Sequence, residues 1–411
     1  MAVTRSSVLL VLLPLSLSCL SWAADELGAD RPDPKAAGMN AQRLSDIPAR
    51  MQEYVDAHRT AGIVTIVARH GRVAGFEAVG YQDLESKKPM RKDALFRIAS
   101  LTKPITCAGI MVLVDAGKIS VIDPVEKFLP EYRGLKINGC AGRSGYNCPG
   151  IAPSRPIDIE DLMKHTSGLS ADGDSRGREE APKTLAEFAL LGVKSPLLFE
   201  PGTAWNYSNI GYDVLGRIVE LVSKQPYDQF LEQHIFEPLG MKDTAFFPAD
   251  EKLSRLATLY TLTDTGLTRS SRQFPAAGPR VPRPAGGLIS SAEDILHFNM
   301  MMRNKGVFNG HRVLSAAAVT LMTTSHTGDM KAGWAPGVGH GYGYEVVRNA
   351  DGMFRYNSIG SYVKGGAFRT YEFVDPEKDL VGVFMMQLTN GGGDTADEIN
   401  SFLAMSAAAI E

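Results

Sequence analysis

The sequence predicts an α+β protein in which one antiparallel β-sheet is flanked by helices and the chain carries a mainly helical insertion. Apolar, β-branched runs at residues 63–67 and 73–79 indicate two neighbouring strands near the N-terminus. Runs of the same character return late in the chain, at residues 341–347, 365–374 and 380–387. The region between them has apolar residues at helical spacing, separated by Gly- and Pro-rich loops. Strands at both ends with helices between them predict a single sheet assembled from the two terminal parts of the chain.

Residues 1–23 are expected to be a secretory signal peptide. A positive charge precedes an apolar run at residues 8–20, and Ala23 and Ala24 offer small residues for cleavage. The run is shorter than the roughly 20 residues that a membrane span needs, which disfavours a membrane anchor. Lipid attachment at Cys19 is a further alternative. We therefore expect an exported protein, periplasmic or secreted, whose mature chain has no stable membrane span.

The first part of the mature chain, residues 24–122, is expected to contribute a helix, a hairpin and a second helix. Apolar residues recur at helical spacing over residues 44–55. The dipeptide His70-Gly71 separates the two strands and predicts a tight hairpin turn. The apolar run at residues 105–114 ends shortly before a glycine, as expected of a buried helix.

The rest of the chain divides at residue 285. Residues 123–284 are the predicted insertion, with helical patterns at residues 212–222 and 227–236. Residues 285–411 are expected to complete the sheet and to end in a helix at residues 395–410.

Two local signals organise this C-terminal part. Ser290 and Ser291, with Glu293 and Asp294 three residues later, form a capping-box pattern that predicts the start of a helix. Residues 375–379 read Asp-Pro-Glu-Lys-Asp, which is strong turn chemistry. The two strands on either side of this turn are therefore expected to be antiparallel neighbours.

Composition limits the functional classes. Of 411 residues, 44% are hydrophobic and 22% are charged, values typical of a folded globular protein rather than a disordered one. The formal net charge is -3, so no basic surplus indicates nucleic acid as a partner. A small-molecule substrate is the expected partner.

Three cysteines remain after the signal peptide. Cys140 and Cys148 bracket a Gly-, Ser- and Asn-containing loop, and an oxidising compartment would allow a disulfide between them. Their spacing fits no zinc pattern, and no metal site is expected. Cys107 lies in an apolar helical pattern and is expected to be a small buried residue.

Ser100 and Lys103 form an S-x-x-K pattern just before the predicted helix at residues 105–114. At a helix start, residues three apart share a face, and the exposed N–H groups favour a serine alkoxide. Burial would lower the pKa of the lysine and allow it to act as a base. The same spacing at Ser361 and Lys364 falls in a predicted strand, where the two side chains point to opposite faces. The plain alternative is that Ser100 caps the helix and Lys103 is solvated.

Tyr207-Ser208-Asn209 is the second motif, and it precedes a predicted helix. A tyrosine hydroxyl beside an ammonium group has a lowered pKa and can relay a proton. Asn209 would offer its amide to the substrate or to Lys103. The alternative is that Asn209 caps the helix and Tyr207 is a packed aromatic.

These motifs belong to an ordered series that resembles the serine β-lactamase-like superfamily. The series spans about residues 35–390, and its likeness is greatest to class C β-lactamase-like hydrolases and family VIII carboxylesterases. The segments are FRIASLTK at 96–103, LMKHTSGL at 162–169, YSN at 207–209, IFEPLGM at 235–241, AGGLIS at 285–290 and VDPE at 374–377. The resemblance implies a DD-peptidase/β-lactamase-like fold.

The resemblance also implies roles for individual residues. Ser100 would be the nucleophile, Lys103 and Tyr207 the proton-transfer pair, and Asn209 a substrate-binding residue. The third element of the family, Lys-Thr-Gly in β-lactamases, corresponds best to Lys364-Gly365-Gly366 at the start of the strand before Asp375. The backbone N–H groups of Ser100 and Ala367 would then form the oxyanion hole.

The third element departs from the β-lactamase pattern. Lys364 keeps a cation that can bind a substrate carboxylate, but Gly365 lacks the hydroxyl. Lys364 as a solvated residue at a sheet edge is the alternative. The departure favours a serine hydrolase that cleaves carboxylic esters of small substrates through an acyl-enzyme at Ser100.

Two other functions stay open. One is a β-lactamase or D-Ala carboxypeptidase acting on β-lactams or cell-wall peptides. The other is a weakly catalytic protein that binds cell-wall fragments. No organic cofactor is expected, and no G-x-S-x-G, H-E-x-x-H or P-loop motif is present.

Four further aromatic residues are expected to have plain structural roles. His165 follows a helical pattern and is expected to make a structural hydrogen bond. Trp334, His340 and Tyr342 lie in a Gly-rich stretch, where packing or turn formation is favoured over a place in a pocket wall.

Overall fold

The computed structural model describes residues 27, 29, 31–139, 149–171, 182–274, 280–349, 356–390 and 396–411. The predicted signal peptide and the cysteines Cys140 and Cys148 lie outside the described residues.

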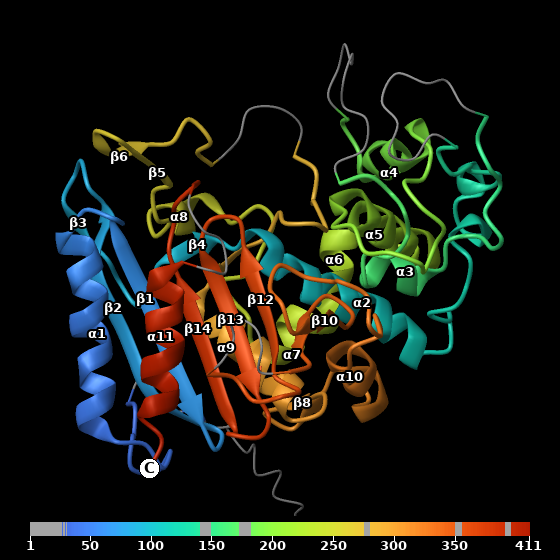
Figure 1. Ribbon diagram of the computed structural model, residues 1–411. Helices are drawn as coiled ribbons and strands as arrows, with labels where there is room; N and C mark the ends of the chain where they lie inside the picture. Colours follow the sequence, from blue (N-terminus) through green and yellow to red (C-terminus); the bar gives the residue numbers. More distant parts are fainter. Residues whose placement is uncertain are drawn as a thin grey trace, which may run out of the picture.

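An antiparallel sheet built from both ends of the chain forms the centre of the described part (Figure 1). Strand β1 of the N-terminal part pairs with β14 of the C-terminal part, so the two parts meet inside the sheet. This arrangement confirms the predicted α+β class. In sheet order, the strands are β10 (Val338–His340), β11 (Glu345–Val347), β12 (Tyr362–Gly366), β13 (Thr370–Asp375), β14 (Leu380–Met385), β1 (Gly62–Arg69), β2 (Arg72–Asp83) and β3 (Lys88–Pro89).

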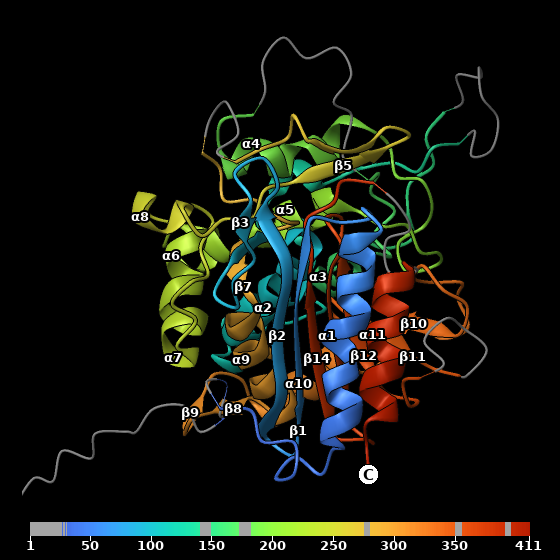
Figure 2. The same ribbon diagram turned by 90° about the vertical axis from the view of Figure 1, so that its left-hand side faces the viewer.

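Helices cover both faces of this sheet. Figure 2 shows the sheet nearly edge-on, with α1 (Ala41–Asp56) and α11 (Asp397–Ala408) on one side and α2 (Thr102–Asp115) and α9 (Ala292–Arg303) on the other. Each side has its own apolar core of buried side chains. Because both faces are covered, β13 and β14 are buried along their whole length.

The N-terminal elements form where their local signals predict them. The apolar residues of α1 face the sheet, and the Asn40 side chain caps the helix by accepting a hydrogen bond from Arg43 N at 3.0 Å. His70 and Gly71 both have positive φ, at 53° and 74°, as a tight hairpin turn between β1 and β2 requires.

The middle of the chain is mainly helical, but it also contains a hairpin that its helical pattern did not predict. Strands β5 (Tyr260–Thr263) and β6 (Gly266–Arg269) pair with each other. The hairpin is anchored on the chain after β14, because Tyr260 N donates to Gln387 O at 3.2 Å and Thr389 N donates to Tyr260 O at 2.9 Å. The α-helices described in this middle part are α3 (Ile159–Met163), α4 (Leu185–Ala189), α5 (Asn209–Ser223), α6 (Tyr227–Leu231), α7 (Glu237–Leu239) and α8 (Asp250–Leu253). The C-terminal part also contains β8 (Val307–Phe308), β9 (His311–Arg312) and α10 (Ala316–Thr323).

The single strand predicted at residues 365–374 is wrong. The chain turns after β12, with Arg369 N donating to Gly366 O at 2.9 Å and Arg369 at φ 60°, and β13 begins at Thr370. Lys364, Gly365 and Gly366 therefore end the preceding strand instead of starting the strand before Asp375. Strand-favouring residues flank this turn on both sides, at 362–363 and 370–374, so the sequence pattern did not separate the two strands.

The capping box predicted before α9 is half formed. Ser291 accepts a hydrogen bond from Asp294 N at 3.1 Å, as an N-cap should. The Asp294 carboxylate instead accepts from Asp243 N at 2.7 Å and from the Thr244 hydroxyl at 2.8 Å. Partners distant in sequence have replaced the local half of the motif.

None of the described helices combines the length and the apolar character that crossing a bilayer requires.

Candidate active site

Ser100 lies where a short strand meets a buried helix. Strand β4 (Leu95–Arg97) pairs with β7 (Ile289–Ser291) and leads into the 3₁₀ turn Ala99–Leu101, which continues directly into α2. Ala99 has φ 47°, a left-handed conformation that costs a residue with a Cβ about 1–3 kcal/mol. Such strain is retained where the surrounding packing enforces it, and here it sets the direction of the next side chain, Ser100.

Lys103 is fully buried one turn after Ser100, and its amine contacts neutral oxygens. Nζ donates to Ser100 Oγ at 3.2 Å, to Asn209 Oδ1 at 2.9 Å and to the Ala285 carbonyl at 2.6 Å. Burial lowers the pKa of Lys103 from its ordinary value of 10.5; Tyr207 opposes this shift and Lys364 adds to it. Among the described residues, no carboxylate lies within ion-pair distance of this amine. Lys103 is therefore a buried cation that can lose its proton easily.

Tyr207 completes a contact triangle with Ser100 and Lys103. Its hydroxyl donates to Ser100 Oγ at 2.8 Å, and Lys103 Nζ lies 4.6 Å from the centre of its ring. Burial raises the pKa of Tyr207, but the positive charges of Lys103 and Lys364 outweigh burial and lower it from 10.0. A tyrosine with this balance can exchange a proton with the serine and the lysine.

Ser208, not Asn209, caps helix α5. Ser208 Oγ accepts a hydrogen bond from Gly211 N at 3.2 Å and donates to the Ser170 carbonyl at 2.8 Å. The cap thus leaves the Asn209 side chain available to Lys103. The alternative that Asn209 is the helix cap does not hold in the structure.

The end of β12 closes the other side of the site. Lys364 is 1% exposed, so it is not a solvated edge residue, and its Nζ lies 5.2 Å from the ring centre of Tyr207. A Cβ on Gly366 would lie 2.5 Å from the Ile98 carbonyl, so glycine is required for β12 to approach the segment before Ser100. Gly365 precedes it in the same strand and Ala367 follows it.

A cleft of about 580 Å³ opens beside Ser100. Ser100, Asn209, Ala285, Gly286 and Ala367 all contribute to its walls. Ser100 and Ala367 therefore face the same space, as two backbone N–H donors to one oxygen must. In the part of the chain that the structure describes, no cluster of His, Cys, Asp or Glu side chains is arranged to hold a metal ion.

Aromatic rings surround Tyr207, and sequence reasoning largely missed them. Trp205, Trp334 and His165 contact the Tyr207 ring at centroid distances of 6.3, 5.4 and 4.4 Å. His340 contacts His165 and Trp205. Trp334 is 57% exposed at the rim of this group. The alternation of Trp205 and Tyr207 in an extended segment is the signal that would have placed both rings on one face.

His165 has the structural role that its position predicted. Its Nδ1 accepts a hydrogen bond from Ser208 N at 3.1 Å, which joins the turn after α3 to the start of α5. Burial lowers the pKa of His165 well below 6.5, and His340 and the two lysines act in the same direction, so the ring is neutral. Tyr342 is farther from the chemistry and donates to Glu160 Oε2 at 2.9 Å.

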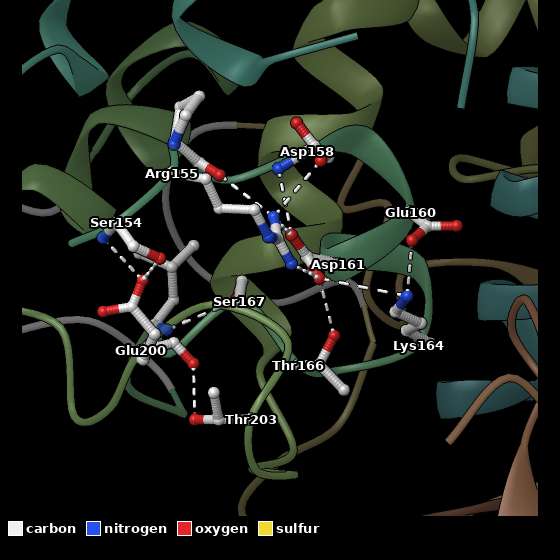
Figure 3. A network of polar contacts seen from close by, with 12 residues as sticks. Ser154, Arg155, Asp158, Glu160, Asp161, Lys164, Thr166, Ser167, Glu200 and Thr203 are labelled. Carbon is white, nitrogen blue, oxygen red and sulfur yellow. Dashed lines mark hydrogen bonds and ion pairs between the residues drawn. The ribbon is translucent and has the colours of Figure 1, made fainter. Parts of the chain in front are cut away.

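An ion-pair network holds the turn after α3, which contains His165, in place (Figure 3). The buried Asp161 carboxylate accepts from Arg155 at 2.6 and 3.1 Å and from the Thr166 hydroxyl at 2.8 Å. Lys164 pairs with Glu160 at 2.6 Å. Because His165 lies between Lys164 and Thr166, both of which are tied to the network, the ring beside Tyr207 is held firmly.

Cys107 is buried, as predicted, and lies 3.6 Å from the Tyr212 hydroxyl. Burial raises the pKa of its thiol to about 12, so it is an inert thiol and no competing nucleophile.

Known proteins resemble this chain along most of its length. The family model that matches, over residues 47–405, is described as Beta-lactamase. Esterase EstB of Burkholderia gladioli is 29% identical over 395 residues, covering 87% of this chain and 93% of its own. Penicillin-binding protein 4 of Amycolatopsis lactamdurans is 31% identical over 310 residues, which are 74% of each chain. Among solved structures, EstCE1, a hydrolase with promiscuous acyltransferase activity, matches with a TM-score of 0.74 and 26% identity, covering 89% of this chain and 98% of its own.

Proposed function

The chain belongs to the Beta-lactamase family and is a serine hydrolase, and on this premise we propose that it is a carboxylesterase that forms an acyl-enzyme on Ser100. One observation carries the proposal. Ser100 Oγ is within hydrogen-bond distance of two proton acceptors of lowered pKa, Tyr207 at 2.8 Å and Lys103 at 3.2 Å, at the wall of an open cleft.

The hydrogen bonds of Lys103 explain how its lone pair reaches the serine. A neutral amine has two N–H donors, and Asn209 Oδ1 and the Ala285 carbonyl accept both. The lone pair is then directed toward Ser100 Oγ and the Tyr207 hydroxyl. Loss of the serine proton to this pair leaves the alkoxide beside the positive end of α2.

Attack of Ser100 on an ester carbonyl forms a bond from Oγ to the carbonyl carbon. The carbonyl oxygen becomes negative and accepts hydrogen bonds from the backbone N–H groups of Ser100 and Ala367. When the carbon–oxygen bond to the alcohol breaks, the proton taken from Ser100 passes through Tyr207 to the departing alcohol. A water molecule then attacks the acyl carbon and gives its proton to the same pair. The bond from Oγ to that carbon breaks, the proton returns to Ser100 Oγ, and the acid is released.

Gly365 supports an ester as the substrate over a β-lactam. A glycine at this position offers no hydroxyl beside Lys364 to bind the carboxylate of a β-lactam. The 29% identity to an esterase along most of both chains is in agreement.

A β-lactam or a cell-wall peptide is the second candidate substrate. The buried ammonium of Lys364 beside Tyr207 favours it, since a cation there suits a substrate carboxylate. The likeness to Penicillin-binding protein 4 points the same way. Rates on a short-chain p-nitrophenyl ester and on a chromogenic cephalosporin discriminate the two, and a strong preference for the cephalosporin would reverse the ranking.

An active-site serine phosphonate tests the proposal directly. We expect one adduct per chain, mapped by mass spectrometry to Ser100, and no adduct in Ser100→Ala. Ser361→Ala is the matched control, because Ser361 has the same S-x-x-K spacing but precedes a strand. Labelling that persists in Ser100→Ala would remove the proposal. Cell-wall fragments that bind without any turnover would instead favour a binding protein.

A further inference from the structure

We propose that Arg97 and Arg272 form a cationic subsite in the Ser100 cleft that binds a carboxylate carried by the substrate. The inference rests on the proposed esterase function and deepens it, because it names the chemical class of the ester. It depends on residues that the catalytic steps do not use.

The two arginines lie in the same cleft as the nucleophile. Arg97 ends strand β4, three residues before Ser100, and Arg272 comes from the segment after β6. The guanidinium carbons lie 4.7 Å and 5.5 Å from the centre of the same ring, that of Phe368. Phe368 directly follows Ala367, the second proposed donor to the oxyanion. The two cations are thus close to the reacting carbonyl.

Their charges are not neutralised within the described chain. The described lining of the cleft contains four arginines and no Asp or Glu. Arg283 pairs with Asp213, with hydrogen bonds of 3.1 and 2.8 Å. By contrast, neither Arg97 nor Arg272 is ion-paired with any carboxylate among the residues described.

Keeping two such cations together without an anion is unfavourable. Burial lowers the pKa of Arg97 from 12.5, and the neighbouring Arg272 lowers it further. Arg97 nevertheless donates from Nη1 to the Arg272 carbonyl, so the two residues are linked directly. An anion bound between them would relieve both the desolvation and the repulsion.

Arg97 is also held rigidly, as expected of a residue that binds a ligand. The Gln387 side chain accepts from Arg97 N at 3.2 Å and donates to Arg97 O at 3.1 Å. This amide fixes the backbone of Arg97 in register with β4. A guanidinium fork on a fixed backbone suits the planar, bidentate recognition of a carboxylate.

The rest of the cleft fits a hydrocarbon next to that carboxylate. Phe188, Phe247, Phe274 and Phe368 line its walls. Because the Phe368 ring lies against both Arg97 and Arg272, this lining suits an ester with a short hydrocarbon segment and a terminal carboxylate. Such an ester carries its carboxylate either on the acyl group or on the alcohol.

Two pairs of esters, each with and without the carboxylate, test the proposal and separate these sources. The acyl pair is 4-nitrophenyl hydrogen glutarate and 4-nitrophenyl pentanoate. The alcohol pair is 3-(butanoyloxy)benzoate and phenyl butanoate. For at least one pair, Arg272→Gln and Arg97→Gln should each lower kcat/KM on the carboxylate ester about 10- to 100-fold, the effect of losing a charge-assisted hydrogen bond. The ratio of kcat/KM on the carboxylate ester to kcat/KM on its neutral partner should therefore fall about 10-fold or more.

The neutral esters report on folding and on the proposed function itself. Arg72→Gln removes the same charge from an exposed position outside the cleft. It should leave the carboxylate-to-neutral ratio of kcat/KM unchanged for both the acyl pair and the alcohol pair. Added salt should weaken the carboxylate preference of the wild type. If neutral esters are cleaved at Ser100 but neither ratio moves in Arg272→Gln and Arg97→Gln, the subsite is refuted while the esterase stands. If Ser100→Ala cleaves the neutral esters as fast as the wild type, the proposed function itself fails.

Discussion

Two buried lysines of this protein, Lys164 and Lys103, have opposite surroundings. Lys164 is 7% exposed and pairs with Glu160 at 2.6 Å, with Asp161 at 4.0 Å. Lys103 is 0% exposed and contacts a serine hydroxyl, an amide oxygen and a backbone carbonyl. The groups around each amine distinguish a structural cation from a reactive one. The first has carboxylates beside it, whereas the second contacts neutral acceptors, and burial lowers its pKa.

The two environments are joined through one residue. His165 follows Lys164 in sequence, and its ring contacts Tyr207 at 4.4 Å. The ion pairs of Figure 3 therefore support the ring that packs against the proton-transfer pair. Because buried ion pairs lose much of their attraction to desolvation, their main use here is to fix positions rather than to add net stability.

The largest effect is expected when the reactive cation is removed. Lys103→Met keeps the length of the side chain and its apolar stem but removes the amine, so folding should be retained. We expect kcat/KM on a neutral p-nitrophenyl ester to fall about 10³-fold, within the range for loss of a general base. Lys118→Met, at an exposed position, is the control and should stay at wild-type activity. A Lys103→Met enzyme within tenfold of the wild type would contradict the role of the amine.

A carboxylate placed beside Lys103 should convert it into a structural cation. Asn209→Asp introduces a negative charge about 2.9 Å from Nζ and should raise the pKa of Lys103. In the wild type, activity falls as pH drops through the lowered pKa, because the base then holds a proton. In Asn209→Asp this acid limb of kcat/KM should move to higher pH, with activity at pH 7 about 10²-fold lower.

Asn209→Ala distinguishes the effect of the added charge on the pKa of Lys103 from the effect of losing the Asn209 amide. It removes the same acceptor without adding a carboxylate, so its acid limb should stay near that of the wild type. An acid limb that moves equally in Asn209→Ala and Asn209→Asp would show that charge is not the cause.

Disrupting the ion pairs around Asp161 should have a smaller effect on activity but a clear effect on stability. Asp161→Asn removes the buried carboxylate shared by Arg155 and Thr166 and should cost about 3 kcal/mol in the free energy of unfolding. The figure is at the low end for buried pairs because the Arg155 side chain is 36% exposed. Urea unfolding measures it, and kcat of the folded enzyme should change less than about threefold.

Asp158→Asn is the matched change in the same network. Its carboxylate is partly exposed and 3.2 Å from Arg155, and asparagine is equally suited to cap α3. We expect a loss under about 1 kcal/mol. Equal losses in the two variants would argue against burial as the reason that Asp161 matters.

The features of the site that depend on local sequence pattern could be predicted from the sequence. Ser100 and Lys103 share a face because they are three residues apart at a helix start. The neutral acceptors of Lys103 could not be predicted, because Asn209 and Ala285 are more than a hundred residues away along the chain. Helix periodicity carries no information on which distant oxygen will face a given amine.

The turn after β12 shows the same limit. The sequence predicts one strand over residues 365–374, yet Arg369 adopts φ 60° and the chain reverses there. The reversal is supported by contacts with a distant segment, since the Thr370 hydroxyl donates to the Ile98 carbonyl at 2.8 Å. Tertiary contacts overrode the local preference for one continuous strand.

The protonation state of Lys103 is the most direct test of the comparison. Isotope-labelled lysine side chains, followed by NMR as a function of pH and assigned with Lys103→Met, give the pKa of its amine. We expect the Lys103 signal to titrate below 10.5, the ordinary value for lysine, because burial disfavours its charged form. A Lys103 amine that stays charged up to pH 10.5 and beyond would contradict the claim that this lysine is built to release its proton.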